Sequence, residues 1–501
     1  MIREDIKNII KKVVGNEAID FSVEAPANKS FGDYSTNVAM VLKKNPAEIA
    51  EKIKSDLFEK VEIKNGFINF FISPDYLKRE LENALKQKRK NKNKKINVEF
   101  ISANPTGPLT LGNGRGGFGG DVLCNVFKKA GYKVTREYYI NDIGNQIKKL
   151  GQSVLGGLEA EYKGNYILDL RKKITGNDFK NAGEMAAKII LDKMIKPSVK
   201  KMGIKFDVWF SEKSLYKNKE VEKVIEDLKK RGFTYEREGA LWFKSKDLGD
   251  NKDRVLIRTD GEKTYFASDI AYLKNKFKRG FDRLFFFLGA DHYGYIARLR
   301  AACYALGYDK EKIDALVLQL VRLFENGQEV RMSKRTGIYV TIDELIDEVG
   351  LDAARFLFLM RGLDTHMNFN MDLAKKQSKE NPVYYVQYAY ARISSILKKS
   401  KKIKFRAKNL KLLNESSELS LILQLIRLPE IIEDTVKDHK VQRLPQYATE
   451  LADAFHKFYE NCRVICKEKG LSEARLALVM SAKIVLKDVL DLMGVSAPQK
   501  M

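Results

Sequence analysis

Strand-like and helical segments alternate between residues 96 and 307, and this alternation constrains the fold more than any other feature of the chain. Strand-like segments occur at 96–102, 133–140, 254–259 and 283–291. Helical patterns at 121–131 and 296–307 fall between or after them. Because strands that alternate with helices are typical of βαβ units, the pattern predicts a parallel, doubly wound α/β sheet.

Two further regions flank this part of the chain. Residues 86–95 contain seven lysines and arginines and no apolar residue, which is typical of a linker. Before it, a helical pattern and the alternating "GFINFF" predict a small α+β domain, and from residue 341 onward the apolar spacing is helical almost throughout. We therefore expect three domains, at 1–90, 91–345 and 346–501, the last an all-α bundle.

Composition narrows the class of protein. The 501 residues carry a formal net charge of +25, which indicates either a polyanionic partner such as nucleic acid or only a lysine-rich solvated surface. Four scattered cysteines argue against a zinc site and a disulfide framework, so we expect reduced core cysteines in a cytoplasmic protein. The N-terminal segment contains acids and no long apolar run, which excludes a signal peptide and a membrane span there.

The stretch "LGNGRGG" raises a specific alternative. Gly112, Gly114 and Gly117 match the spacing G-x-G-x-x-G, and Glu137 stands where a dinucleotide-binding fold places its ribose-binding acid. A nicotinamide-dependent oxidoreductase would show this pattern, but there the first glycine follows the strand directly, whereas nine residues, 103–111, intervene here. Glycines disfavour a helix, so either a ligand approaches this backbone closely or a helix packs tightly on a strand.

A second nucleotide signal lies in "ENGQEVRMSKRTG", 325–337. Arg331, Lys334 and Arg335 cluster in a loop bounded by Gly327 and Gly337. Mobile cations of this kind suit a departing pyrophosphate, whose charge grows in the transition state. Together with the glycine-rich stretch, they predict adenylate-forming chemistry on ATP.

The sequence resembles the class I aminoacyl-tRNA synthetases, whose signatures H-I-G-H and K-M-S-K-S correspond here to "TLGN" and "RMSKR". More narrowly it resembles the bacterial arginyl-tRNA synthetases over nearly its full length. The matching segments are "GDYSTNVAM", "VEFISANPTGPL", "EYYINDIGNQI", "YFASDIAYL", "LGADHYGYIARLRAA", "DAARFLFLMR", "ENPVYYVQYAYARI" and "LADAFHKFYENCRV". The resemblance implies a Rossmann-like catalytic domain, an N-terminal domain that recognises the tRNA elbow, and a helical anticodon-binding domain.

It also implies substrates and residues. The substrates are L-arginine, ATP with Mg²⁺, and tRNA(Arg), and we expect a monomer with neither zinc nor a membrane partner. The signature positions implied to be catalytic are Thr110, Asn113, Arg331, Lys334 and Arg335, and those implied to bind ATP are Gly112, Gly114, Met332 and Ser333. The positions matched to arginine binding are Glu99, Ser102, Asn104, Tyr265, Asp269 and His292. Those matched to tRNA binding are Phe67 and Asn69 at the elbow and Tyr385, Tyr388 and Arg392 at the anticodon.

Physical readings of these residues stand beside the resemblance. A planar guanidinium with five donors needs a carboxylate that accepts a fork, which suits Asp269, although a helix N-cap would also place an Asp there. Glu99 could be an outward-facing charge, Asn104 a turn former, and His292 a structural hydrogen-bonding group. Tyr385, Tyr388 and Arg392 are spaced three and four residues apart and so share one face of a helix. This face could contact tRNA bases, or it could belong to the core of the domain.

The first signature departs from its family pattern. Thr110 occupies the position of the first histidine and Asn113 that of the second. A threonine can donate one hydrogen bond to a phosphate but cannot be cationic, and losing such a donor commonly lowers the rate by about a hundred- to a thousandfold. We therefore predict an active arginine–tRNA ligase that depends more heavily on its basic loop. The alternatives are a catalytically weakened tRNA-binding paralogue and the oxidoreductase.

Overall fold

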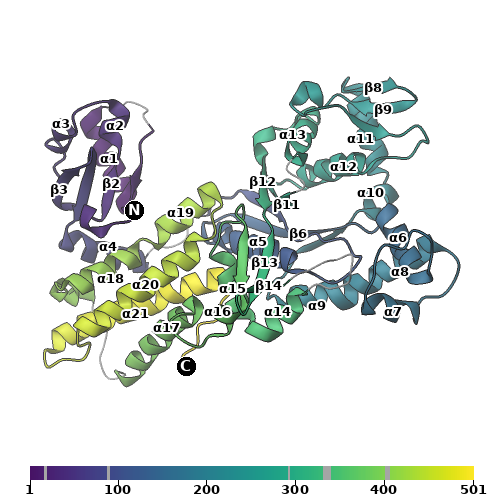
Figure 1. Ribbon diagram of the computed structural model, residues 1–501. Coiled ribbons are helices and arrows are strands. Elements are labelled where there is room, and N and C mark those ends of the chain that lie inside the picture. The colour runs from purple at the N-terminus through teal and green to yellow at the C-terminus, as the bar shows by residue number, and fades with distance from the viewer. Residues whose placement is uncertain (16–19, 87–90, 291–293, 331–339, 401–406) are drawn as a thin grey trace.

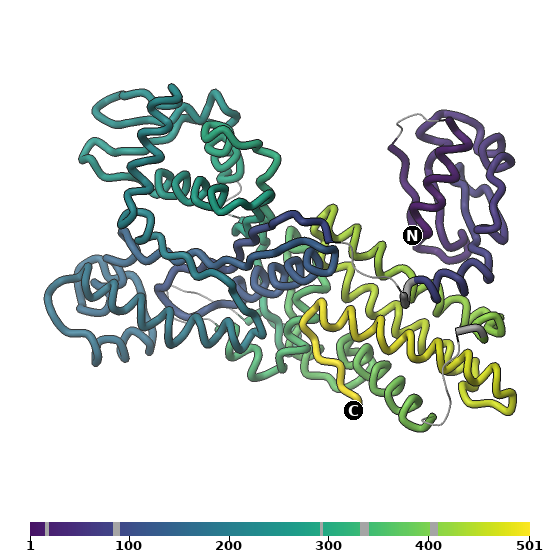
Figure 2. Tube along the Cα trace, turned by 180° about the vertical axis from the view of Figure 1, so that it is seen from behind, coloured from purple at the N-terminus to yellow at the C-terminus, as the bar shows by residue number. Residues whose placement is uncertain are grey.

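The computed structural model describes the chain apart from residues 16–19, 87–90, 291–293, 331–339 and 401–406, and of 84–86, 407 and 408 it describes only the backbone. Figure 1 shows a small N-terminal domain above a bundle of long C-terminal helices, with the central sheet and two lobes beside them. Seen from behind in Figure 2, the N-terminal domain stands on the opposite side of the molecule from the two lobes.

Five strands form the sheet at the centre, in the order β12-β11-β5-β6-β7, and every neighbouring pair is parallel. They are β5 (Lys95–Glu99), β6 (Lys133–Ile140), β7 (Val208–Ser211), β11 (Arg283–Gly289) and β12 (Ile313–Leu318). The predicted parallel, doubly wound sheet is confirmed. Its strand order reverses between β5 and β11, and Rossmann-like sheets bind ligands at that point, beyond the carboxyl ends of the strands.

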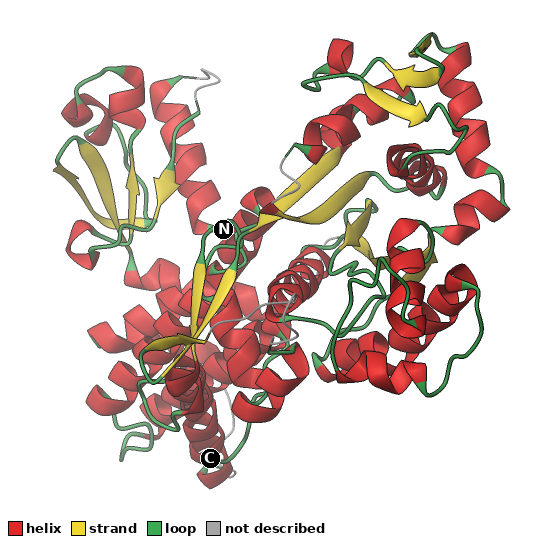
Figure 3. Ribbon diagram, turned by 45° about the vertical axis from the view of Figure 1, so that its right-hand side comes forward, coloured by secondary structure: helices red, strands yellow, loops and turns green. Residues whose placement is uncertain are grey.

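One segment expected in this sheet lies elsewhere. The strand β10 (Arg254–Ile257) pairs antiparallel with β9 (Ala240–Phe243), which pairs with β8 (Thr234–Arg237) in a separate three-stranded sheet visible in the upper lobe of Figure 3. Only one residue of β10 is buried, whereas four successive residues of β11 are. Because a strand inside a parallel sheet is buried on both faces, β10 suits the edge of an antiparallel sheet.

Alternation along β11 divides the core between the two faces of the sheet. Leu284 and Phe286 join the core formed with α11 (Glu220–Lys230), α12 (Tyr265–Lys278) and α13 (Tyr295–Ala305). Phe285 and Phe287 point to the other face and join the core that contains α5 (Leu111–Lys129). This period of two is the pattern that a strand buried on both faces requires.

The glycine-rich stretch is helical from its start, because α5 includes all six glycines between 112 and 120. A Cβ added at five of them would lie 2.4–2.8 Å from a neighbouring side chain: Ile342 at Gly114, Leu318 at Gly116, Met202 at Gly117, Leu363 at Gly119 and Phe100 at Gly120. Of the two explanations drawn from the sequence, tight helix packing therefore holds at these five positions. Tertiary packing overrides the low helix propensity of glycine here.

The N-terminal domain is built on an antiparallel sheet of order β1-β2-β4-β3. Its strands are β1 (Val23–Glu24), β2 (Tyr34–Thr36), β3 (Phe58–Lys64) and β4 (Phe67–Ile72), and its helices are α1 (Ile2–Val14), α2 (Val38–Leu42), α3 (Pro46–Ala50) and α4 (Pro74–Lys86). The predicted α+β character of this region is confirmed.

The lower lobe of Figure 1 is helical. It consists of α6 (Asn145–Leu155), α7 (Asn165–Arg171), α8 (Phe179–Ile190), a π-helical turn (Leu191–Ile195) and α9 (Lys196–Lys201), and the short α10 (Lys213–Lys217) follows β7. No described helix is both long and apolar enough to cross a membrane.

The C-terminal region is helical with one exception. Its helices are α14 (Ile342–Val349), α15 (Leu351–Leu359), α16 (Met371–Lys375), α17 (Pro382–Lys399), α18 (Ser416–Ile426), α19 (Leu428–Asp438), α20 (Arg443–Asn461) and α21 (Lys469–Met493). The exception is β15 (Met367–Asn370), which pairs parallel with β13 (Val321–Glu325), itself paired with β14 (Gln328–Val330). A strand had not been expected there.

Candidate active site

Acidic and polar side chains gather beyond the carboxyl ends of the central strands. Glu99 ends β5, and Ser102 and Asn104 follow in the turn after it. Glu212 follows β7 directly, and Asp269 lies in the second turn of α12. The carboxyl ends of parallel strands share one edge of the sheet, where the strand order reverses, so these residues mark the expected ligand site.

Glu99 is paired with a fully buried cation. The Nζ of Lys276 donates to Glu99 Oε2 at 2.7 Å and to Asn97 Oδ1 at 2.7 Å, and it lies 4.0 Å from Glu137 Oε1. The side chain of Lys276 is 0% exposed and that of Glu99 is 14% exposed. Glu99 is therefore not an outward-facing charge, which was the alternative left open by the sequence.

Glu137 is occupied within the protein. Arg279 donates to both of its carboxylate oxygens, at 2.6 and 2.7 Å, and the hydroxyl of Tyr272 donates to Oε1 at 2.5 Å. Burial opposes ionisation, but Lys276 and Arg279 outweigh it and hold the pKa of Glu137 at about 2. A carboxylate enclosed in this way is not available to a ribose hydroxyl, which removes the main support for the oxidoreductase alternative.

Neither Glu212 nor Asp269 forms an ion pair with a cation of the described residues, although the charge of Arg298 acts on Asp269 from further away. Burial raises the pKa of Glu212 to about 8, and the negative charges of Asp269 and Asp142 add to the effect against the opposing influence of Ser268. Burial likewise raises the pKa of Asp269 to about 7; the charge of Glu99 adds to this effect, and Tyr295 and Arg298 oppose it. Lys276 and Arg279 form ion pairs with Glu99 and Glu137, so within the described residues Glu212 and Asp269 are the two of these four acids without an ion pair, and we call them the uncompensated acids.

Glu212 was missed in the sequence, and its surroundings show what it lacks. The residue is 1% exposed, and its Oε2 has no hydrogen-bond partner within the described part of the chain. A buried carboxylate oxygen without a donor is unfavourable, so it invites a cationic ligand. The strand before it, "VWFS", is short and only half-buried, which explains why its carboxyl end was not recognised.

Asp269 and Tyr265 lie on the same helix. Tyr265 is the first residue of α12 and Thr264 is the N-cap, so the alternative that Asp269 is an N-cap is wrong. Tyr265 is 45% exposed, and its hydroxyl accepts a hydrogen bond from the backbone N–H of Asn145 at 3.1 Å. Residues four apart on a helix share a face, which brings this ring toward the carboxyl of Asp269.

The turn after β5 is strained. Ile101 and Ser102 have φ values of 64° and 37°, a left-handed conformation that residues other than glycine rarely adopt and that is least favourable for a β-branched residue such as Ile101. The hydroxyl of Ser102 accepts a hydrogen bond from the backbone N–H of Tyr139 at 3.1 Å, and the side-chain amide of Asn104 donates to Gln146. The turn thus links β5 to β6 and α6 at the edge of the site.

The first signature forms a cap rather than an open loop. The backbone N–H and the hydroxyl of Thr110 both donate to Asn113 Oδ1, at 2.9 and 3.1 Å. Gly112 is exposed, with no atom closer than Thr110 Oγ1 to the position of an added Cβ, whereas Gly114 is buried against Ile342. Of the two glycines matched to ATP, only Gly112 leaves open space.

The chain after the second signature returns to the first. Thr110 forms an antiparallel bridge with Thr341, and the backbone N–H of Ile342 donates to the carbonyl oxygen of Leu109 at 3.0 Å. Residues Arg331, Met332, Ser333, Lys334 and Arg335, together with His292, lie outside the described residues. The first described residues after 331–339 therefore lie beside "TLGN".

The aromatic face of α17 comes together with α20. The guanidinium of Arg392 lies between the rings of Tyr388 and Tyr459, at 4.7 and 4.9 Å from their centroids. Tyr388 is exposed, and the half-buried Tyr385 donates to Asp453 Oδ1 at 2.6 Å. Tyr459 was missed in the sequence, because spacing within α17 cannot reveal a partner on another helix.

The two residues matched to the tRNA elbow differ in exposure. Phe67 begins β4 beside the turn at Gly66 and is 38% exposed, whereas Asn69 is 3% exposed between β2 and β3. Exposed Met40 lies beside Gly66, whereas exposed Ile63 pairs with Ile68 and so belongs to the face of the sheet opposite Phe67. Of the two matched residues, Phe67 is therefore the one exposed at the surface, beside Lys64, and Asn69 is buried two residues further along β4.

Comparisons with known proteins agree with this arrangement. Three family models match the chain: arginyl tRNA synthetase N terminal domain at 1–72; tRNA synthetases class I (R), catalytic domain, at 77–155 and 159–365; and DALR anticodon binding domain at 386–501. An arginine–tRNA ligase of Carboxydothermus hydrogenoformans is 45% identical, over 97% of this chain and 95% of that protein. One of Caldanaerobacter subterraneus subsp. tengcongensis is 44% identical, over 100% and 99%.

A solved structure supports the fold. The arginyl-tRNA synthetase of Thermus thermophilus matches with a TM-score of 0.80 over 100% of both chains, at 21% identity. The catalytic-domain model covers more than half of this chain, and the curated relatives are similar to it from end to end. The chain therefore belongs to the arginyl-tRNA synthetases, a family of class I aminoacyl-tRNA synthetases.

Proposed function

We propose that this chain is an arginine–tRNA ligase that activates L-arginine with ATP to arginyl-adenylate, releases pyrophosphate, and transfers the arginyl group to the 3′-terminal adenosine of tRNA(Arg). The observation that supports the proposal most directly is the pair of uncompensated acids, Glu212 and Asp269. They lie beyond the carboxyl ends of the central strands, in a chain that matches the class I catalytic domain. Class membership implies transfer to the 2′-hydroxyl, and family behaviour implies that tRNA must be bound for activation.

The arginine site would divide into two ends. Glu212 and Asp269 would receive the guanidinium fork, with the Tyr265 hydroxyl beside Asp269. Glu99, Ser102 and Asn104 would line the end that holds the α-amino group, with Glu99 held in place by its hydrogen bond from Lys276. His292 would complete this set by its match to the family. Charge-assisted hydrogen bonds of this kind are stronger than neutral ones.

The ATP site would lie at the start of α5. The amino end of a helix favours phosphate, and the open backbone at Gly112 leaves room for one. Arg331, Lys334 and Arg335, with Met332 and Ser333 in the same loop, would draw the pyrophosphate away as its charge develops. Mg²⁺ would accompany ATP, because a hard cation neutralises the triphosphate mainly through phosphate oxygens and water.

Thr110 and Asn113 would act through the shape of the helix start. The Thr110 hydroxyl donates to Asn113 in the empty site and would have to turn to donate to a phosphate. Gly114 would support the site indirectly, because it lets Ile342 pack against α5. We expect Thr110→Ala and Lys334→Ala to slow arginine-dependent pyrophosphate exchange with tRNA present, and unchanged exchange in both variants would contradict these roles.

The tRNA would contact all three predicted domains, 1–90, 91–345 and 346–501. Phe67 would meet the elbow, supported by the buried Asn69 two residues along β4, and the exposed ring of Tyr388 with Arg392 would meet the anticodon. Tyr385 would hold this face in place through Asp453. We expect the protein to act as a monomer in the cytoplasm.

Charging of tRNA(Arg) by the purified protein tests the function directly. We expect arginine to be attached in the presence of ATP and Mg²⁺, with lysine and glutamine as amino-acid controls. The catalytically weakened paralogue would bind tRNA(Arg) without charging it. Binding of a nicotinamide cofactor in place of ATP, followed by intrinsic fluorescence, would instead revive the oxidoreductase.

A further inference from the structure

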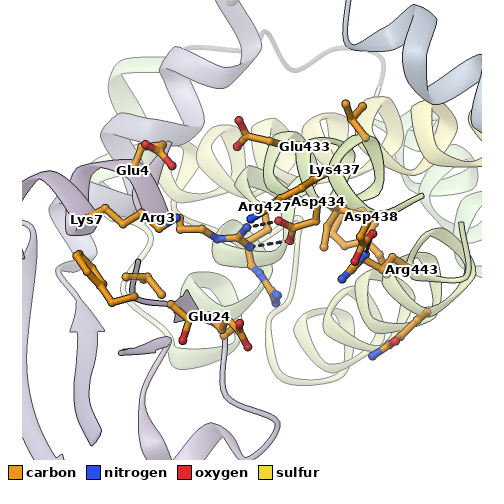
Figure 4. A pocket seen from close by; sticks show the side chains of 18 of the residues that line it. Arg3, Glu4, Lys7, Glu24, Arg427, Glu433, Asp434, Lys437, Asp438 and Arg443 are labelled. Carbon is orange, nitrogen blue, oxygen red and sulfur yellow. Dashed lines mark hydrogen bonds and ion pairs between the residues drawn. The ribbon is translucent and has the colours of Figure 1, made fainter. Parts of the chain in front are cut away.

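The N-terminal domain meets the helix bundle at two carboxylates of α19, Glu430 and Asp434, which Figure 4 shows in part. The backbone N–H of Arg3 donates to Glu430 Oε1 at 2.9 Å, and the hydroxyl of Tyr34 donates to Glu430 Oε2 at 2.9 Å. The guanidinium of Arg3 donates to both carboxylate oxygens of Asp434, from Nη1 to Oδ1 and from Nη2 to Oδ2 at 2.9 Å. The spacing of four places the two acids on one face of α19.

This contact is buried and specific. The side chain of Glu430 is 2% exposed, and each of its oxygens is satisfied by a donor from the N-terminal domain. Burial and the charge of Glu430 raise the pKa of Tyr34 well above its ordinary value, so its hydroxyl stays a donor. A carboxylate buried in this way is favourable only while both donors are in place, which ties it to one orientation of the domain.

Beside the contact the two domains are separated by a cavity of about 920 Å³. Most of its lining is charged or polar, including Lys7, Glu24, Arg427, Glu433 and Lys437. A cavity of this kind provides little apolar packing between α1 and the bundle. Directional polar contacts at Arg3 and Tyr34 therefore set the orientation of the domain at this end.

A second contact lies on α4. The Nζ of Lys78 donates to Asn414 Oδ1 at 2.8 Å and to the carbonyl oxygen of Lys411 at 3.4 Å. Two contacts on separate elements, α1 with β2 and α4, restrict rotation about either one. The domain is thus held at a fixed angle to the bundle.

The first contact connects directly to the strand that carries Phe67. Tyr34 lies on β2 and pairs in register with Phe70 of β4, three residues after Phe67. The ring of Phe67 is at the start of that strand and is 38% exposed. Moving Tyr34 relative to α19 would therefore move Phe67 relative to the bundle.

We propose that Arg3, Tyr34, Glu430 and Asp434 form an interdomain clamp that positions Phe67 for the tRNA elbow. The clamp residues are positioning residues, because they act on tRNA through the placement of β4. The proposal depends on the elbow role given to Phe67 above. Its partner is the same tRNA whose anticodon meets α17, so the clamp sets the relation between two contacts on one molecule.

A double-mutant cycle between Arg3 and Phe67 tests the clamp in the full-length enzyme. We expect Arg3→Ala and Phe67→Ala each to raise KM for tRNA by about tenfold, the loss of roughly one charge-assisted or stacking contact, with little change in kcat. The double variant should be no worse than either single one, because a misplaced Phe67 no longer contributes. Additive effects would overturn the clamp while leaving the elbow role intact.

Matched variants separate the clamp from general damage. Lys7→Ala removes the same charge one turn along α1, lines the same cavity, and should leave KM for tRNA unchanged. Asp434→Asn breaks the ion pair from the side of the bundle, keeps the N-terminal domain intact, and should reproduce the effect of Arg3→Ala. Arg3→Lys should recover part of the affinity. An unchanged KM in Phe67→Ala would instead remove the elbow role, and the purpose of the clamp with it.

Discussion

The carbonyl oxygen of Leu109 accepts a hydrogen bond of 3.0 Å from the backbone N–H of Ile342, and this bond joins two segments more than two hundred residues apart. Thr110 precedes α5 and Thr341 precedes α14, and the two threonines are bridged. The amino ends of two helices therefore lie side by side. Such ends carry partial positive charge, which favours an anion at this edge of the sheet.

Substitutions within α5 should distinguish its packed glycines from its open one. A Cβ at Gly120 would lie 2.4–2.7 Å from Phe100 atoms that include its Cβ, so Gly120→Ala should destabilise the protein by about 3 kcal/mol through overpacking. Gly112→Ala meets no such atom and should stabilise it by up to about 1 kcal/mol through helix propensity. Thermal denaturation of both variants measures the contrast, and equal midpoints would contradict the packing.

Removing either uncompensated acid should impair the use of arginine. Glu212→Gln and Asp269→Asn should each lower kcat/KM for arginine. The loss of binding free energy should be about 2–5 kcal/mol, the range for truncating one partner of a buried charge pair. Affinity for tRNA should stay unchanged. Glu226→Gln, on the exposed face of α11, is the matched control and should behave like the parent enzyme. Normal arginine activation in both pocket variants would reject this assignment.

The same acids should make arginine binding depend on pH. The pKa values of Glu212 and Asp269 are raised to about 8 and about 7. A bound guanidinium favours the ionised carboxylates, so these two side chains should release protons when arginine binds. Affinity should rise from pH 6 to 8, by up to about tenfold per pH unit for each carboxyl that must ionise, and then level off. Calorimetry in buffers of different ionisation enthalpy measures the proton release, which Glu212→Gln should reduce.

Without arginine, the contribution of the same two acids to protein stability should change with pH in the direction opposite to arginine affinity. Between the ordinary carboxyl pKa values near 4 and the raised ones, the folded state binds more protons than the unfolded state. The contribution of Glu212 and Asp269 to the free energy of unfolding should therefore fall as pH rises from about 4 to about 8. Denaturant titrations of Glu212→Gln against the parent isolate this contribution, which should make the variant relatively more stable at pH 8 than at pH 5.

Stacking at the anticodon face should depend on Tyr459 as well as Tyr388. Both rings flank the guanidinium of Arg392, and base stacking on an aromatic ring is worth roughly 1–3 kcal/mol. Tyr459→Ala should weaken binding of tRNA(Arg) within this range. A tRNA with a substituted anticodon should show a smaller loss. Equal losses with both tRNAs would place the contact elsewhere on the tRNA.

The features of the fold that the sequence predicts are those with strong local patterns. The alternation of strand-like and helical segments between 96 and 307 indicated the parallel sheet, and helical spacing in the last third indicated the bundle. The helix at 111–120 was not recognised, because glycine opposes a helix locally and packing against side chains such as Phe100, Met202 and Leu363 explains it. Those contacts come from distant segments, which no local pattern reveals.

The site was predictable only in part, for a related reason. Glu99 and Asp269 stand in recognisable motifs, but their difference in charge balance depends on Lys276, which reaches Glu99 from α12. Glu212 follows a strand of four residues that becomes recognisable only through its pairing with β6. Asn69 stands two residues after Phe67 on β4, yet it is buried where Phe67 is exposed, a difference that strand alternation does not predict.

The uncompensated acids Glu212 and Asp269 also bear on the accuracy of amino-acid selection. A planar fork with five donors can serve Glu212 and Asp269 together, whereas the ammonium of lysine is a single compact charge and the urea group of citrulline carries none. Competitors of either kind leave a buried acid without its counter-charge, and sites that leave polar groups unpaired reject such analogues by a factor of about 10⁴–10⁵. Discrimination of this size is large enough to make a separate proofreading step unnecessary.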